Sequence, residues 1–158
     1  MIYLKNAEQL QCMRKAGGLL YEVLCRLREA VKPGMSTTEL DVYAEQMIRK
    51  HKAIPSFLDY QGYPASICAS VNDEVVHGIP ADDVILKEGD VLSVDCGLIL
   101  DGWQADSANA AICEESPGFS VALPFSLHVH HGACGKPLAV GMANCHPPCG
   151  VKPSLPCR

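Results

Sequence analysis

Two aspartates on either side of a predicted turn are the strongest chemical signal in the sequence. Asp95 lies inside the apolar segment 91–97, where a buried carboxylate must be paired, hydrogen-bonded or bound to a cation. Asp106 follows Asp101-Gly102, a dipeptide typical of two-residue β-hairpin turns. One such acid would more often be hydrogen-bonded to backbone at a strand edge. Two acids on one face favour a metal site.

The predicted turn sets the register of the hairpin. If Leu100 pairs with Trp103, Asp95 lies opposite Ala108, and Asp106 is its diagonal neighbour on the same face. Their Cα atoms would then be about 5.5–8 Å apart. This spacing suits one cation, or two ions about 3.5–4 Å apart. Hard oxygen ligands suit Mn, Fe, Co or Zn, but two carboxylates alone make an incomplete site.

Two helices and a group of strands must position these acids. Asn6 with Gln9, and Ser36 with Glu39, form capping-box patterns that predict helix starts. Apolar residues then recur at helical spacing, first at Leu10, Met13, Ala16, Leu20, Leu24 and Leu27, then at Leu40, Tyr43, Ala44 and Met47. Strands are predicted at residues 66–71, 74–77, 90–98 and 103–112. The expected class is α+β, with the helices segregated from an antiparallel sheet.

The composition is that of a globular domain, with 48% hydrophobic and 20% charged residues among 158. A net charge of −5 gives no reason to expect nucleic acid as a partner. The sequence shows no secretory signal and no apolar run long enough to span a membrane, which favours a cytoplasmic location. Five of the nine cysteines lie in apolar patterns and are expected to be reduced core residues: Cys12, Cys25, Cys68, Cys96 and Cys113.

The composition changes near residue 116. All 18 acidic residues precede this point, and seven of the 11 prolines follow it. We therefore divide the chain into a domain of residues 1–115 and a Pro/Cys/His-rich tail, 116–158, expected to be frameshifted or disordered. A truncated paralogue and a zinc-binding tail are the alternatives, although the spacing of the tail donors matches no common zinc site. Those donors are His128, His130, His131, Cys134, Cys145, His146 and Cys149.

Several segments of residues 1–115 resemble type I methionine aminopeptidases. The segments Gly62–Cys68 and Ser70–Pro80, which includes Asn-Asp-Glu-Val-Val-His-Gly-Ile-Pro, are similar to the family's substrate-pocket signature. Residues 86–97 continue this likeness, and residues 101–108 resemble the segment that carries the family's second aspartate ligand. Met13–Gly17 resembles the family's first helix. The likeness indicates the amino-terminal part of the family.

The resemblance implies the amino-terminal half of a pita-bread (creatinase/aminopeptidase-like) fold. It also implies removal of the initiator methionine from nascent polypeptides by metal-activated water. Asp95 and Asp106 match two ligands of a site for two divalent ions (Co, Mn, Fe or Zn). His77 matches a catalytic histidine that contacts substrate near the scissile amide. The residues that match the methionine pocket are Phe57, Tyr60, Tyr63 and Cys68.

Departures from the family pattern limit what the resemblance implies. Gln104-Ala105 stands where many members have His-Gly, and the family's remaining ligands, one histidine and two glutamates, have no counterpart. We therefore expect a truncated chain of doubtful activity. One alternative is a non-catalytic pita-bread module that contacts nascent chains or lies near ribosomes, without binding a membrane. Another is a proline-directed peptidase on the same fold.

Overall fold

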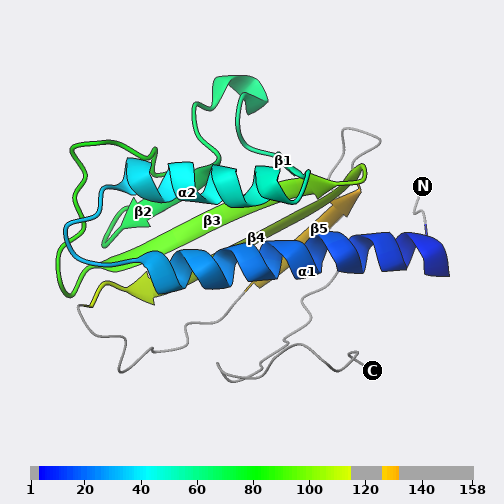
Figure 1. Cartoon of the computed structure of the whole chain (residues 1–158), viewed down its shortest axis with the longest axis horizontal. Helices are drawn as coiled ribbons and strands as arrows, with labels where there is room; N and C mark the ends of the chain where they lie inside the picture. The colour runs from blue at the N-terminus through cyan, green and yellow to red at the C-terminus, as the bar shows by residue number, and fades with distance from the viewer. Residues whose placement is uncertain (1–3, 115–125, 132–158) are drawn as a thin grey trace.

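Two helices lie side by side across one face of an antiparallel sheet (Figure 1). The structure, a computed structural model, describes residues 4–114 and 126–131. The sheet has the order β1-β3-β4-β5, and β2 also pairs with β3. The elements are α1 (Ala7–Ala30), α2 (Thr37–Lys50), β1 (Ile54–Pro55), the 3-10 helix η1 (Tyr60–Gly62), β2 (Ile67–Val71), β3 (Val91–Leu100), β4 (Trp103–Ile112) and β5 (Ser126–His131). The expected α+β class is confirmed.

Both helices begin at the capping boxes that the sequence predicts. The Asn6 side chain accepts a hydrogen bond of 2.8 Å from the Gln9 amide, and the Gln9 side chain accepts one of 3.0 Å from the Asn6 amide. Ser36 and Glu39 exchange the same pair of bonds, at 3.1 and 2.8 Å. Each exchange satisfies two amides that a helix start leaves without intrahelical partners.

The core lies between the helices and the sheet. The largest fully buried side chains come from both layers and include Leu20, Leu24, Leu27, Leu40, Ile48, Ile67, Leu92 and Leu98. Leu10 was expected in this core but is 41% exposed. The buried positions of α1 begin at Met13, so the first turn of the helix contributes no buried side chain to this core.

The hairpin β3–β4 turns at Asp101-Gly102, as predicted. Asp101 has φ +51° and Gly102 has φ +81°, the positive pair that a type I′ turn requires. Because this turn twists in the same sense as the strands, it lets β3 and β4 pair along their whole length.

The strand predicted at residues 74–77 is absent, and that prediction is wrong. The two valines of this segment are exposed, and the chain there runs as a loop. The Glu74 carboxylate accepts a hydrogen bond from the Val71 amide at 3.3 Å, which occupies the edge of β2 where a neighbour would pair. The loop returns to that edge at one point, where Gly78 accepts a 2.8 Å bond from Ala69.

Two strands were not predicted. β1 is only two residues long and pairs Ile54 with Ile99. β5 lies within the tail of residues 116–158 and pairs antiparallel with β4. The tail residues that flank it lie outside the described residues, and so do Cys134, Cys145, His146 and Cys149 of the zinc alternative. The division at residue 116 stays a prediction.

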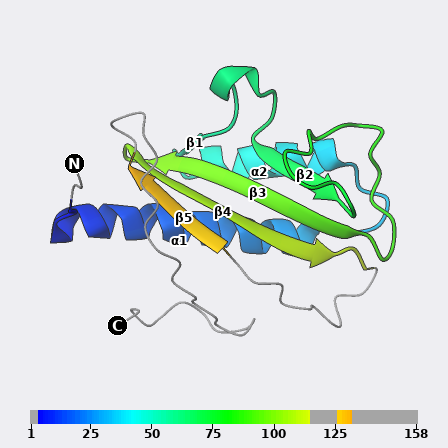
Figure 2. The same cartoon turned by 180° about the vertical axis from the view of Figure 1, so that it is seen from behind.

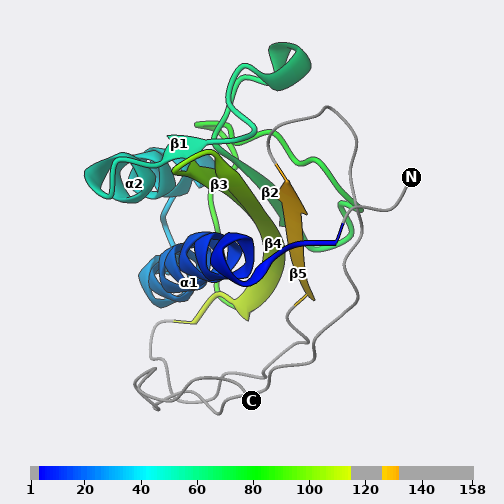
Figure 3. The ribbon, with the colours of Figure 1, turned by 90° about the vertical axis from the view of Figure 1, so that its right-hand side faces the viewer.

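The second face of the sheet carries no helix among the described residues (Figures 2 and 3). Side chains alternate along β3, so Leu92, Val94, Cys96 and Leu98 point to the helices, and the intervening residues point to this open face. No helix in the described part of the chain could cross a membrane. Of the five cysteines expected in the core, Cys68, Cys96 and Cys113 are buried, whereas Cys12 and Cys25 are only half-buried.

Candidate metal and substrate site

The hairpin brings Asp95 and Asp106 together on the open face. Asp95 pairs with Ala108, and Asp106 pairs with Gly97, which is the register that the sequence predicts. The two carboxyl groups are therefore diagonal neighbours on adjacent strands. Both residues are partly buried. The geometric part of the prediction is confirmed, while their role as metal ligands stays a prediction.

The two carboxyl groups perturb each other. Burial, followed by the nearby charge of Asp106, raises the pKa of Asp95 to about 7. Burial also raises the pKa of Asp106, although a hydrogen bond shared with Asp95 opposes that increase. Two acids this close cannot both ionise without cost, so without a cation the pair keeps a proton up to a pH of about 7.

A divalent cation suits this pair because it would replace the retained proton and offset the repulsion. Asp95 and Asp106 offer hard oxygen donors, which Mn, Fe, Co and Zn accept. Among the residues that the structure describes, no group of three His, Cys, Asp or Glu side chains could hold one ion. In the backbone register of β5, His128 lies opposite Asp106. A metal site built on this pair would therefore need further donors.

Cys68 and Tyr63 lie next to the aspartates. Cys68 pairs with Asp95 across β2 and β3 and shares its face of the sheet. Burial raises the pKa of the Cys68 thiol, and burial with a hydrogen bond to Cys68 raises that of the Tyr63 hydroxyl. Both groups are therefore neutral at pH 7. They form an uncharged wall of a kind that suits an apolar or thioether side chain.

The Phe57 ring packs against Gly97 on the same face of the sheet as the two aspartates. A Cβ atom at Gly97 would lie 2.8 Å from the Phe57 ring and would also collide with the Ser56 hydroxyl. The Ser56 amide donates a 3.0 Å hydrogen bond to the Gly97 carbonyl, which holds this segment against β3. Gly97 is also the register partner of Asp106. Phe57 is therefore held beside the carboxyl pair.

Tyr60 is the predicted pocket residue that the structure does not bring to the site. It belongs to η1, which projects from the sheet (Figure 3), and it is 65% exposed. Its hydroxyl accepts a 3.4 Å hydrogen bond from the neighbouring Gln61 side chain. Its place in the pocket stays a prediction.

His77 is exposed and has a φ of +59°, a conformation that non-glycine residues rarely adopt. Its positive charge would favour ionised Asp95, and this interaction lowers the pKa of that carboxyl. The structure therefore places His77 within electrostatic range of the aspartates. Its contact with substrate stays a prediction.

Asp41 supports the site and was missed by sequence reasoning. Its Oδ1 accepts hydrogen bonds from the amides of Ser66 and Ile67, at 2.8 and 2.9 Å. These bonds attach α2 to the start of β2, just before Cys68. Burial raises the pKa of Asp41, and the two amide bonds oppose that increase. An acid inside a helix gives no local signal of such a contact.

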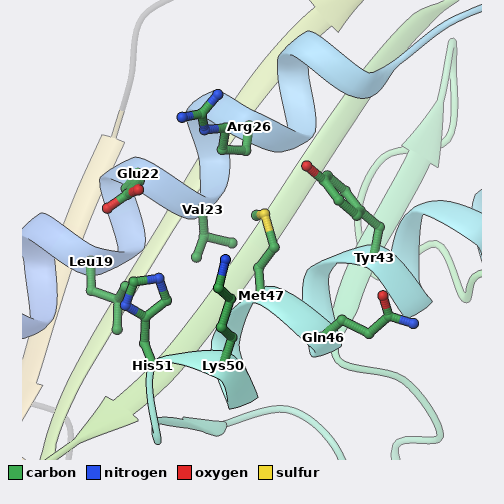
Figure 4. A pocket seen from close by; sticks show the side chains of 9 residues that line it. All are labelled: Leu19, Glu22, Val23, Arg26, Tyr43, Gln46, Met47, Lys50 and His51. Carbon is green, nitrogen blue, oxygen red and sulfur yellow. The ribbon is translucent and has the colours of Figure 1, made fainter.

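A hollow of about 400 Å³ lies on the other side of the sheet, between α1 and α2 (Figure 4). Its lining includes Leu19, Glu22, Val23, Arg26, Met47 and Lys50. Neither aspartate borders it, because the helices cover the opposite face. The carboxyl pair lies instead on an open sheet surface.

A family match gives the class of protein. The model of metallopeptidase family M24 matches residues 11–139, and the chain belongs to this family. The match extends past residue 115. The fold and the family resemblance that the sequence indicated are therefore confirmed.

The methionine aminopeptidase of Clostridium acetobutylicum is 53% identical over 108 residues, which are 68% of this chain and 43% of the relative. The crystal structure of the methionine aminopeptidase from Rickettsia prowazekii is 39% identical, with a TM-score of 0.70 over 73% of this chain and 46% of that one. Escherichia coli aminopeptidase P, at 18% identity and a TM-score of 0.58, shares the pita-bread fold. The chain spans less than half the length of each of these relatives.

Proposed function

We propose that this chain carries the methionine pocket and two metal ligands of an aminopeptidase that removes amino-terminal methionine from new polypeptides. The observation that carries the proposal is the convergence of Asp95, Asp106 and Cys68 on the open face, with Phe57 and Tyr63 beside them. The methionine aminopeptidases among its relatives support the choice of substrate.

Each residue has a role that follows from its position. Asp95 and Asp106 would hold the metal, which supplies a lowered water pKa and polarises the scissile carbonyl. Cys68, Tyr63 and Phe57 would enclose the methionine side chain, because neutral sulfur and aromatic groups favour a thioether. His77 would contact the substrate near the scissile amide. Co, Mn, Fe and Zn all fit the oxygen donors.

The test uses this chain completed with the carboxyl-terminal half of a methionine aminopeptidase, and it measures metal-dependent release of methionine from the peptide Met-Ala-Ser. We expect release only with added Co²⁺ or Mn²⁺, and none from a peptide that begins Xaa-Pro. Asp106→Ala should reduce release by at least about a hundredfold, since it removes a group acting at the reaction centre. Asp82→Ala, which changes an exposed acid outside the site, should have no effect.

Release that needs no metal, or that persists in Asp106→Ala, would contradict the proposal. Cleavage of the Xaa-Pro peptide alone would identify a proline-directed enzyme. Binding of Met-Ala-Ser without any release of methionine would identify the non-catalytic binding module.

A further inference from the structure

The loop that carries His77 is attached to β2 by its next residue, Gly78. The Gly78 amide donates a hydrogen bond of 3.1 Å to the hydroxyl of Ser70, and both residues are buried. The Gly78 carbonyl accepts a hydrogen bond of 2.8 Å from the Ala69 amide and one of 3.3 Å from the Tyr63 hydroxyl. Both polar groups of Gly78 are therefore bonded to the strand or to its flanking segment.

The loop backbone at Gly78 lies too close to β2 for a side chain to fit between them. A Cβ atom there would collide with the Ala69 carbonyl and lie 2.7 Å from a Glu74 carboxylate oxygen. The backbone of the loop thus lies directly on the edge of β2, where Ser70 is the residue that reaches its amide.

His77 needs such an attachment because its backbone is strained. A non-glycine residue with φ +59° persists only where the surrounding contacts hold it. The hydrogen-bonded groups belong to Gly78, the residue directly after His77. They therefore restrict where the His77 side chain can lie relative to Asp95.

We propose that Ser70 is a positioning residue, whose hydroxyl holds the Gly78 amide and thereby keeps His77 within electrostatic range of Asp95. The proposal rests on the proposed function for the role of His77, but the attachment itself can be measured without substrate. In this proposal Ser70 acts on His77 through the loop.

The sharpest comparison is between Ser70→Thr and Ser70→Val in the full chain. The two variants have the same shape and suit a strand, but only threonine keeps the hydroxyl. We expect amide hydrogen exchange at Gly78 to be at least about fivefold faster in the valine variant than in the threonine variant, the factor expected for one lost hydrogen bond. The His77 imidazole resonances should move in the valine variant and stay near the parent positions in the threonine variant.

Ser66→Ala is the matched control. Ser66 is buried on the same segment, but its hydroxyl has no hydrogen-bond partner among the described residues. This variant should leave Gly78 exchange and the His77 resonances unchanged. Equal Gly78 exchange and equal His77 resonances in the threonine and valine variants would overturn the proposal, as would an equal effect of Ser66→Ala. Failure to cleave Met-Ala-Ser would count against the proposed function alone.

Discussion

At the scale of the residue, the retained proton of the aspartate pair has a consequence for stability. Burial, followed by repulsion from Asp106, raises the pKa of Asp95 to about 7, whereas an unfolded aspartate titrates near about 4. Between these values the folded chain binds a proton that the unfolded chain has lost, so the free energy of unfolding falls as pH rises. Because solvent screens these partly exposed groups, we expect a loss on the order of 1–2 kcal/mol.

Asp95→Asn should remove the fall in the free energy of unfolding that the parent chain shows as pH rises. In metal-free buffer, the variant should gain stability relative to the parent as pH rises from about 4 to about 7, the window between the two pKa values. Urea unfolding at both ends of this window measures the difference. Asp82→Asn, at an exposed position, is the control and should follow the parent. A gain that appears equally in the control would show that the pair does not share a proton.

At the scale of the element, the β3–β4 hairpin depends on its turn. Gly102 has φ +81°, which a β-branched side chain tolerates poorly. Gly102→Val should therefore lower the free energy of unfolding by about 1–3 kcal/mol. Asp101→Asn should change it by less than about 0.5 kcal/mol, because Asn-Gly also favours this turn. Urea unfolding compares the two, and equal stabilities would contradict the turn geometry described here.

At the scale of the whole molecule, one core joins both helices to the sheet. Leu24 is 1% exposed, whereas Leu10 on the same helix is 41% exposed. Leu24→Ala should cost about 2–5 kcal/mol of stability, and Leu10→Ala less than about 1 kcal/mol. Helical circular dichroism and the fluorescence of Trp103 in β4 should report the same transition, because the two layers share this core. Separate transitions would show that helices and sheet unfold independently.

Local rules made much of the fold predictable from sequence. The capping boxes at Asn6 and Ser36 depend on residues three apart, and the turn at Asp101-Gly102 depends on adjacent residues. Once the turn is known, the period of two along a strand places Asp95 and Asp106 on one face. The same local reasoning failed at residues 74–77, because a strand also needs a free edge to pair with.

Contacts between distant segments were decided only by the tertiary structure. Asp41 accepts a hydrogen bond from the Ile67 amide of β2, and Ser70 accepts one from the Gly78 amide of the next loop. No local pattern marks either pair. The closeness of Phe57 to Gly97 likewise depends on how the loop after β1 packs on β3. The sequence by itself therefore determined the class of fold and the pair of acids. Tertiary packing decided which side chains surround that pair, because those contacts exist only after the chain has brought its elements together.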